Sequence, residues 1–280
     1  MYVGILTGPF TDGPLEVVSA FAAEYGFQGL EVVTGPGSRH LDTRTFDASR
    51  ADEVKALLEL RNLQISGLAA YTDVTHADPE RRKANIATVS SAIDIAHALG
   101  VDVVCTMAGL PPAGKDRHKA IEEDCAEVFP PLIEKAGALG IKLALENWTA
   151  TNIQNLAHWE QIFTVLPSPN FGLNFDPSHL YWQGIDYLGA VDKFGSRIFH
   201  SHGKDTEVRD DIRQKVGYLG HGWWRYVIPG LGRINWGEYI SALRRNGYNG
   251  VISIEHEDSA LEREEGFLIG KKVLEHFIAY

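Results

Sequence analysis

Short apolar runs alternate with helical patterns along the whole of this 280-residue chain. Eight runs of five to seven residues are too short for helices and are predicted to be buried strands. The predicted strands are Tyr2–Leu6, Gly29–Val33, Gln64–Ala69, Val101–Met107, Ile141–Glu146, Phe171–Asp176, Ile198–His202 and Val251–Glu255. The helical patterns are Pro14–Tyr25, Ser49–Arg61, Pro79–Leu99, Asp116–Leu139, Asn155–Leu166, Asp186–Phe194, Trp236–Asn246 and Ala260–Phe277. Eight strand–helix units predict a single α/β domain, a (β/α)8 TIM barrel over residues 1–280.

The main alternative to a closed barrel is an open, doubly wound sheet. Such sheets usually carry a glycine-rich phosphate loop after the first strand, and Thr7–Gly13 does not have the G-x-G-x-x-G spacing.

Pro14 and Pro79 suit the first turn of a helix, where a missing N–H costs nothing. Pro130–Pro131 is expected to kink or restart the fourth helix.

Composition excludes several classes of partner. The 37 acidic and 26 basic side chains give a formal charge of −11, which repels the phosphate backbone of nucleic acids. No apolar run approaches the roughly 20 residues of a membrane-spanning helix, and the first residues lack the basic segment of a signal peptide. Cys105 and Cys125 are too few for a disulfide framework. We therefore expect a cytoplasmic protein that acts on neither nucleic acid nor a membrane.

Four ionisable side chains close four successive predicted strands: Glu146, Asp176, His202 and Glu255. If these strands are parallel neighbours, the four groups meet at one rim of the barrel, where active sites of this fold lie. Three carboxylates that close together repel one another unless a cation lies between them. Three oxygen donors and one imidazole suit Mn²⁺, Mg²⁺, Co²⁺ or Zn²⁺. The sequence therefore predicts a divalent metal site at this rim.

At these positions the chain resembles the xylose-isomerase-like sugar isomerases and epimerases, which include ketose 3-epimerases. The resemblance covers essentially the whole chain and rests on Leu145–Asn147, Asp176–His179, His200–Asp205, Pro229–Gly232 and Ile254–Glu255. It implies one divalent metal, most often Mn²⁺, bound by the four strand-end groups. It also implies that Glu146 and Glu255 act as acid and base on opposite faces of the substrate. His179 would contact the substrate or a metal-bound oxygen.

The chain departs from the epimerase pattern at two positions. The epimerases have a second pocket glutamate where this chain has Asn152, and an arginine where it has Val208. Three segments instead resemble the subgroup that contains the catalytic subunits of C-glycoside deglycosidases, which eliminate from 3-keto sugars. These segments are Lys204–Glu207, Trp223–Tyr226 and Ile254–Asp258. The resemblance thus implies an isomerisation or epimerisation of a ketose or keto-sugar, or alternatively a lyase reaction on a 3-keto glycoside.

Both reactions share a first step that elementary chemistry supports. A proton α to a carbonyl is weakly acidic, and a bound metal stabilises the enediolate as charge develops. A carboxylate on each face can remove the proton and return it to the other face. If a leaving group lies β to the carbonyl, the same enediolate expels it. The expected partner is a small sugar or sugar glycoside. A homo-oligomer is also expected, with a small partner subunit if the protein is a deglycosidase.

Several further residues are candidates for substrate contacts. Lys204 and Asp205 could hold substrate hydroxyls or form an ion pair, and Glu31 ends the second strand and is expected to line the pocket. Trp148 follows a strand and could stack on a sugar. Arg225 lies in Gly203–Ile234, a long segment rich in aromatic and cationic groups that is predicted to be an irregular but ordered loop. This segment is expected to form a wall or cover of the pocket, and a subunit interface is the alternative.

Two other functional classes fit the sequence less well. A nuclease of the apurinic endonuclease type would need a trinuclear site with more histidines and a basic face. A non-catalytic sugar-binding barrel would not need both Glu146 and Glu255. His200, two residues before His202, points to the same side of its strand and is expected to lie one layer deeper, in a supporting role.

Overall fold

The computed structural model describes residues 1–279. Eight parallel strands close into a barrel, because β1 pairs with both β11 and β2. The barrel strands are β1 (Tyr2–Leu6), β2 (Gly29–Gly35), β4 (Gln64–Ala69), β5 (Val103–Met107), β6 (Lys142–Glu146), β7 (Phe171–Phe175), β8 (Ile198–Gly203) and β11 (Val251–Ile254). A short β3 (Leu41–Asp42) extends the sheet beside β2. The predicted (β/α)8 fold is confirmed, and the open sheet is excluded.

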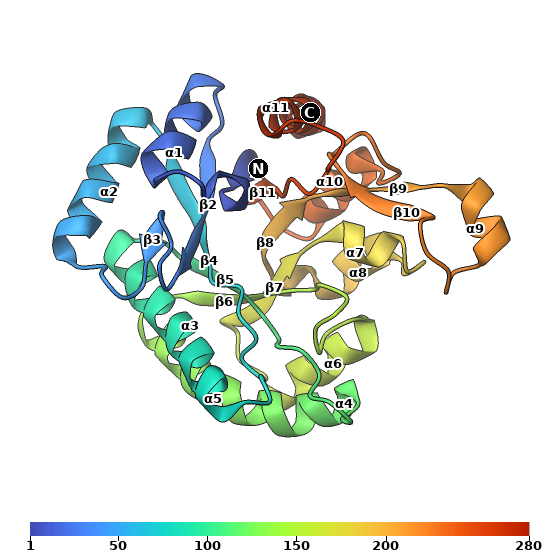
Figure 1. Cartoon of the computed structure of the whole chain (residues 1–280), viewed down its shortest axis with the longest axis horizontal. Coiled ribbons are helices and arrows are strands. Elements are labelled where there is room, and N and C mark those ends of the chain that lie inside the picture. The colour runs from blue at the N-terminus through green and yellow to red at the C-terminus, as the bar shows by residue number, and fades with distance from the viewer. Residues whose placement is uncertain (280) are drawn as a thin grey trace.

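Helices surround the barrel on its outside (Figure 1). The helices are α1 (Leu15–Glu24), α2 (Ala48–Arg61), α3 (Pro79–Leu99), α4 (Arg117–Ala120), α5 (Ala126–Ala138), α6 (Leu156–Val165), α7 (Pro177–Tyr181), α8 (Tyr187–Phe194), α9 (Asp210–Val216), α10 (Trp236–Arg245) and α11 (Arg263–Ile278). Side chains cap several of them: Asp78 accepts hydrogen bonds from the first N–H groups of α3, and Asp186 does the same for α8. Within residues 1–279, no helix is long and apolar enough to cross a membrane.

Of the two outcomes predicted for the double proline, a kink or a restart of the helix, the structure rules out the restart. Pro130 and Pro131 lie inside α5, which runs through both without a break. The irregularity lies upstream, in a π-helical turn at Ile121–Cys125 between α4 and α5. A π turn is one of the usual places where a helix kinks. Pro79 is the first residue of α3, as predicted, whereas Pro14 is the residue just before α1.

The hydrophobic core lies between the barrel and its helices. Strand residues such as Leu30, Leu143, Leu173 and Ile252 are fully buried, as are helix residues such as Val89. Each such side chain contributes about 1.5–3 kcal/mol by leaving water. The register of the parallel strands brings their carboxyl ends to one common rim. Glu146 of β6 pairs with Asn174 of β7, and Ser253 of β11 pairs with His202 of β8.

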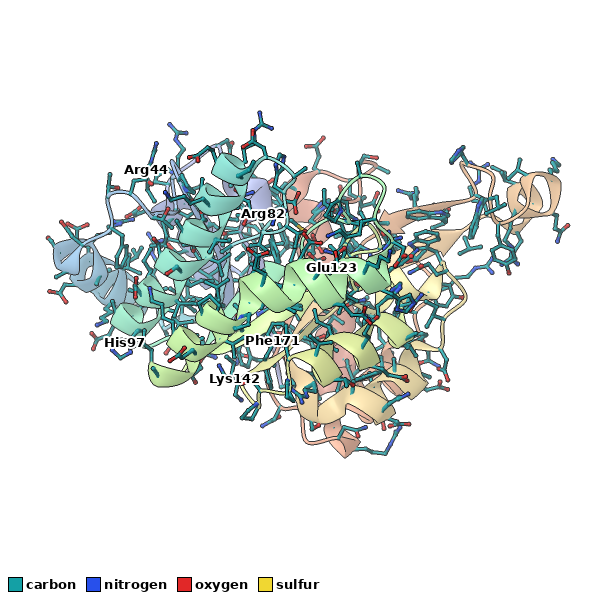
Figure 2. The ribbon with its side chains drawn as sticks, turned by 90° about the horizontal axis from the view of Figure 1, so that it is seen from below. Arg44, Arg82, His97, Glu123, Lys142 and Phe171 are labelled. Atoms are coloured by element: carbon teal, nitrogen blue, oxygen red, sulfur yellow. The ribbon has the colours of Figure 1, made fainter. Side chains whose placement is uncertain are left out.

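The segment predicted to be irregular forms a projecting arm. Strands β9 (Asp205–Val208) and β10 (Trp224–Val227) pair antiparallel, with α9 between them. We call residues 205–227 the arm. It extends well beyond the barrel wall in both views (Figures 1 and 2). The base of the arm follows β8 directly and therefore starts beside the strand-end rim.

Candidate metal centre

The structure brings the four strand-end groups together. Glu146 ends β6, Asp176 and Glu255 directly follow β7 and β11, and His202 is in β8. One ligand atom of each lies within 4.8 Å of the others. Asp176 and His202 are fully buried, and the side chain of Glu255 is only 14% exposed. Three carboxylates and an imidazole therefore share one small, nearly dry space.

The atoms that face this space suit a cation. Nδ1 of His202 lies 3.0 Å from Oε2 of Glu255, 3.7 Å from Oε1 of Glu146 and 3.8 Å from Oδ2 of Asp176. His202 Nδ1 and Asp176 Oδ2 make no hydrogen bond of good geometry, although charged groups lie close to both atoms. A divalent ion among the four groups would be ligated by both atoms, so the residues fit such an ion.

The far side of the His202 ring is held by Glu31. Nε2 of His202 lies 3.0 Å from Oε2 of Glu31, and the hydroxyl of Tyr71 donates to the other Glu31 oxygen at 2.5 Å. Burial alone would raise the pKa of Glu31, but the imidazoles of His202 and His200 lower it to about 2. The ionised carboxylate thus orients the ring so that Nδ1 faces the other three ligands. Glu31 was expected to line the substrate pocket, and the structure places it behind the ligand instead.

Replacing Glu31 by glutamine should weaken metal binding while leaving the fold intact. Carboxylates that support a ligating histidine typically contribute 10–100-fold to metal affinity, so we expect a loss of about that size. Titration of the metal-free protein with Mn²⁺, followed by calorimetry, measures it. Glu59→Gln, on the outer surface of α2, is the matched control. Unchanged affinity in Glu31→Gln would contradict this role.

Both buried carboxylates remain ionised. Burial alone would raise the pKa of Glu146, but the hydrogen bond from His179 and the charge of the nearby His202 imidazole hold it well below the usual value. Burial acts in the same direction on Asp176, and the ammonium of Lys204 with the imidazole of His179 more than offsets it, so this pKa is also lowered. The site therefore concentrates negative charge, which favours a cation.

Lys204 supplies part of the counter-charge. Its Nζ lies 2.6 Å from Oε2 of Glu255, 3.2 Å from Oδ2 of Asp176 and 3.2 Å from Oε2 of Glu257, and it lies over the Tyr226 ring at 4.6 Å. Burial would lower the pKa of Lys204, but Glu255 and Asp176 raise it well above the usual value. Of the two roles expected for Lys204, the structure shows the ion pair.

His179 lies beside the four-ligand group. Asp176 caps α7 by accepting from the backbone N–H of Ser178, and this short helix carries His179 back over the site. Nε2 of His179 lies 3.3 Å from Oε1 of Glu146, and Nδ1 lies 2.6 Å from the Tyr226 hydroxyl. The ring is thus oriented by one group from the arm and one from the barrel.

We expect His179→Ala to lower turnover by about 100-fold, the lower end of what the loss of one positioned hydrogen-bonding group costs. Metal content should remain near one ion per chain, because the four-ligand group does not include His179. Steady-state kinetics and elemental analysis on the same preparation test both points. Loss of the metal would make His179 a ligand and require a different site.

Of the three other expected substrate contacts, two have partners of their own. Asp205 is fully buried and accepts from the backbone N–H groups of Thr206, Gly230 and Ile234 and from the indole of Trp236. We therefore assign Asp205 to holding the base of the arm, not to a substrate. Arg225 pairs with Glu207 and, at 2.5 Å, with Asp258, which joins the arm to the loop after β11. Trp148 is exposed after β6 and remains available for stacking.

Two site residues escaped the sequence analysis. Asn174 lies within hydrogen-bonding distance of His202 Nε2 (2.9 Å) and of His200 Nδ1 (2.9 Å). The sequence could have indicated Asn174, because a strand residue two positions before Asp176 points to the same face of the sheet as Asp176. Glu257 had no such signal, because it lies in the irregular segment after β11. His200 lies behind the ligand histidine, as expected, with Ser66 at its other nitrogen.

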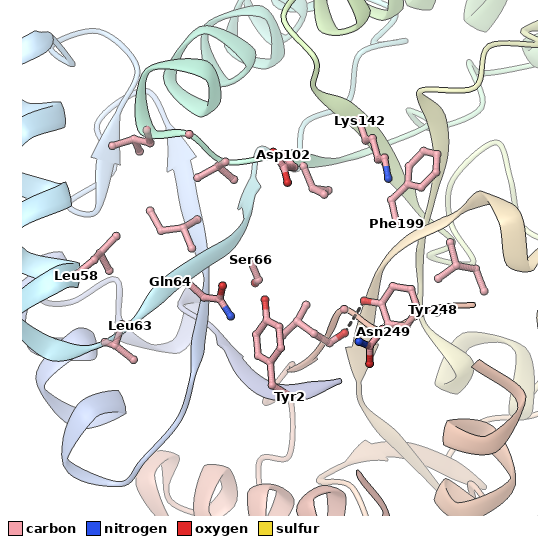
Figure 3. Close-up of a pocket in the computed structure, with 18 of the residues that line it drawn as sticks. Tyr2, Leu58, Leu63, Gln64, Ser66, Asp102, Lys142, Phe199, Tyr248 and Asn249 are labelled. Carbon is pink, nitrogen blue, oxygen red and sulfur yellow. Dashed lines mark hydrogen bonds between the residues drawn. The ribbon is translucent and has the colours of Figure 1, made fainter. Parts of the chain in front are cut away.

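A large cavity opens at the opposite end of the barrel (Figure 3). It has a volume of about 770 Å³ and is lined by first residues of strands, among them Tyr2, Gln64 and Lys142. None of the four ligand residues lines it. The candidate chemistry therefore belongs to the carboxyl-end rim and not to this cavity, which agrees with the usual position of active sites in this fold.

Comparison with known proteins identifies the family. Residues 19–276 match the family described as xylose isomerase-like TIM barrel, and the chain belongs to it. The predicted resemblance is therefore confirmed at family level. The finer likeness to the deglycosidase subgroup stays a prediction.

Two relatives and one solved structure illustrate the family. The uncharacterized protein YfiH of Bacillus subtilis (strain 168) is 30% identical over 95% of this chain and 96% of its own length. An inosose isomerase of Halalkalibacterium halodurans is 26% identical over 81% of this chain and 80% of its own. A crystal structure of the IOLI protein with a bound zinc atom superposes with a TM-score of 0.76, at 21% identity, over 100% of this chain and 98% of that chain.

Proposed function

We propose that this protein is a divalent-metal-dependent sugar isomerase or epimerase that removes a proton α to the carbonyl of a ketose or keto-sugar. The observation that carries the proposal is the convergence of Glu146, Asp176, His202 and Glu255 within 4.8 Å at the carboxyl-end rim. The relative named inosose isomerase supports an isomerase, and the formal charge of −11 argues against a nuclease.

The residues of the chain would divide the work as follows. A divalent ion held by the four groups would supply the positive charge that polarises a substrate carbonyl. Glu146 and Glu255 come from β6 and from the end of β11, which are not neighbouring strands, so their carboxylates approach a bound sugar from different directions. One carboxylate oxygen takes the α proton and the other returns a proton to the opposite face. His179 Nε2 would hold a substrate hydroxyl beside Glu146.

We propose Mn²⁺ as the working metal, with Co²⁺, Zn²⁺ and Mg²⁺ as the other candidates. A site with three carboxylates and one imidazole is oxygen-rich, which suits Mn²⁺ better than a sulfur-preferring ion. The zinc bound in the IOLI structure supports a divalent ion of the same size class.

Elimination from a 3-keto glycoside is the second candidate. The base of the arm favours it, because Trp224 stacks on Trp182 with ring centroids 4.2 Å apart, and the Trp182 indole donates to the Tyr226 hydroxyl next to His179. Such an aromatic wall beside the reacting groups would suit a flat aglycone. One of the two glutamates, Glu146 or Glu255, would take the same α proton, and the electron pair that this proton leaves would expel the aglycone from the β carbon. The other glutamate would give its proton to the aglycone as the aglycone leaves.

Incubation in deuterium oxide with a panel of ketoses and 3-keto glucosides tests the proposal. The protein is loaded with Mn²⁺, and chelator-treated protein is the control. Labelled isomers in the products indicate isomerisation or epimerisation, and a released aglycone indicates elimination. No metal-dependent exchange with any member of the panel would contradict proton abstraction as the function.

A further inference from the structure

Apolar side chains gather at the far end of the arm. Val216, Tyr218 and Leu219 are 44%, 62% and 97% exposed, and they are three of the eight large apolar side chains that are exposed within residues 1–279. Scattered apolar residues on a surface need no explanation, but a group at the tip of a projection marks a contact site. The arm holds this tip away from the barrel (Figures 1 and 2).

A partly apolar hollow lies beside the tip. A cavity of about 340 Å³ opens between the arm and the segment of α7 and α8. Its lining includes the apolar residues Ile185, Val208, Tyr218 and Trp223 and the charged residues Asp186, Arg213 and Arg233. Leu219 follows the lining residue Tyr218 but does not line the hollow itself. A projecting leucine and a hollow large enough for a leucine side chain therefore lie side by side on one surface.

The arm is also the part of the chain that a second copy can approach. It carries four acidic residues (Asp205, Glu207, Asp210 and Asp211) and four basic residues (Arg209, Arg213, Lys215 and Arg225), whereas the whole chain has a charge of −11. Two copies of so acidic a protein repel each other over most of their surface. Contact through two arms whose formal net charge is zero avoids that repulsion.

The arm is ordered within a single copy of the chain. The backbone N–H of Arg209 donates to the carbonyl of Trp223 at 2.7 Å, and the Trp223 ring is buried against Tyr218 at 5.5 Å between centroids. The Arg213 guanidinium lies 5.1 Å from the Tyr218 ring on the same small cluster. Because these groups are already ordered, docking of the tip costs little additional conformational entropy.

We propose that the arm joins two copies of this chain, with Leu219 of each copy seated in the hollow of the other. A two-fold axis makes such a contact self-complementary: if Leu219 meets Ile185 of the second copy, the reverse contact forms as well. The base of the same arm places Tyr226 on His179 and over Lys204. The arm that makes the contact between copies therefore also supplies one wall of the candidate metal centre. This inference does not depend on which reaction the centre performs.

The first experiment measures the size of the full-length protein by sedimentation velocity over a range of concentrations. We expect a dimer for the wild type, and a dimer dissociation constant raised at least about 30-fold in Leu219→Asp, the effect of losing one central interface residue. Leu60→Asp is the matched control, because Leu60 is a leucine 83% exposed on α2, and it should remain dimeric. Circular dichroism shows that both variants are folded.

A second pair of variants tests the geometry directly. Leu219→Cys combined with Ile185→Cys should give a covalent dimer under oxidising conditions, because the proposed contact brings these two positions together across the interface. The two native cysteines are both buried and should not form cross-links of their own. Each single cysteine variant should give none. A monomeric wild type, a dimeric Leu219→Asp protein, or a double cysteine variant that does not cross-link would each overturn the proposal. A wild type that is monomeric alone would point instead to a partner of different sequence at the tip.

Discussion

Replacement of Glu146 or Glu255 by glutamine should lower turnover of the Mn²⁺-loaded protein by about 10³–10⁴-fold, the upper range for general acid–base groups. Glutamine keeps an oxygen that can ligate the metal but cannot take a proton. The metal should therefore stay bound, more weakly, while proton transfer fails. Elemental analysis and steady-state kinetics, both at saturating Mn²⁺, separate the two effects.

The two variants should also differ from each other. If each carboxylate serves one face of the substrate, each variant should lose solvent exchange for one epimer and keep part of it for the other. Glu257→Gln is a matched control, because Glu257 contacts Lys204 but lies outside the four-ligand group. It should cost far less activity than either ligand variant. Equal residual exchange of both epimers in both variants would argue for a single base and against the proposed division.

Lys204→Met should destabilise the metal-free protein by about 3–5 kcal/mol, the usual effect of removing one partner from a buried ion pair. The substitution leaves Asp176 and Glu255 buried without their ammonium partner. The same change removes a positive charge beside the metal, so Mn²⁺ affinity should rise by about tenfold or more. Denaturant unfolding of the metal-free protein and calorimetric titration with Mn²⁺ measure the two effects.

The opposite signs of these two effects make the test specific. A residue that only fills space would lower stability and leave metal affinity unchanged or weaker. Lys204→Arg keeps the charge and is the matched control, so its metal affinity should stay close to that of the wild type. Weaker Mn²⁺ binding in Lys204→Met would show that the lysine supports the ion instead of competing with it for Glu255.

The four ligand residues could be predicted from the sequence because the pattern that places them is local. A short apolar run indicates a buried strand, and the residue that ends the strand lies at the rim of the barrel. Parallel strands in one barrel place all such residues at the same rim, so Glu146 and Asp176 could be assigned together before any contact was known. Asn174 follows from the same period-two rule, since it lies two residues before Asp176 on β7.

The partners of these ligands could not be predicted, because they come from distant parts of the chain. Glu31 lies 171 residues before His202 yet bonds to its ring across the barrel interior. Asp205 follows a ligand strand and was expected to be available for a substrate. Four donors occupy its carboxylate instead, and three of them lie 25 to 31 residues further along the chain. Which charged group binds a ligand and which supports the backbone depends on such packing.

The sequence by itself determined the eight strand–helix units, the barrel and the set of ionisable groups at its rim, because hydrophobic period and strand direction are local properties of the chain. Only the tertiary structure decided that Glu31 supports His202, that Lys204 shares the carboxylates of the site, and that residues 205–227 form an arm with Tyr226 at its base. Those features depend on contacts between segments far apart in sequence, which no local pattern encodes.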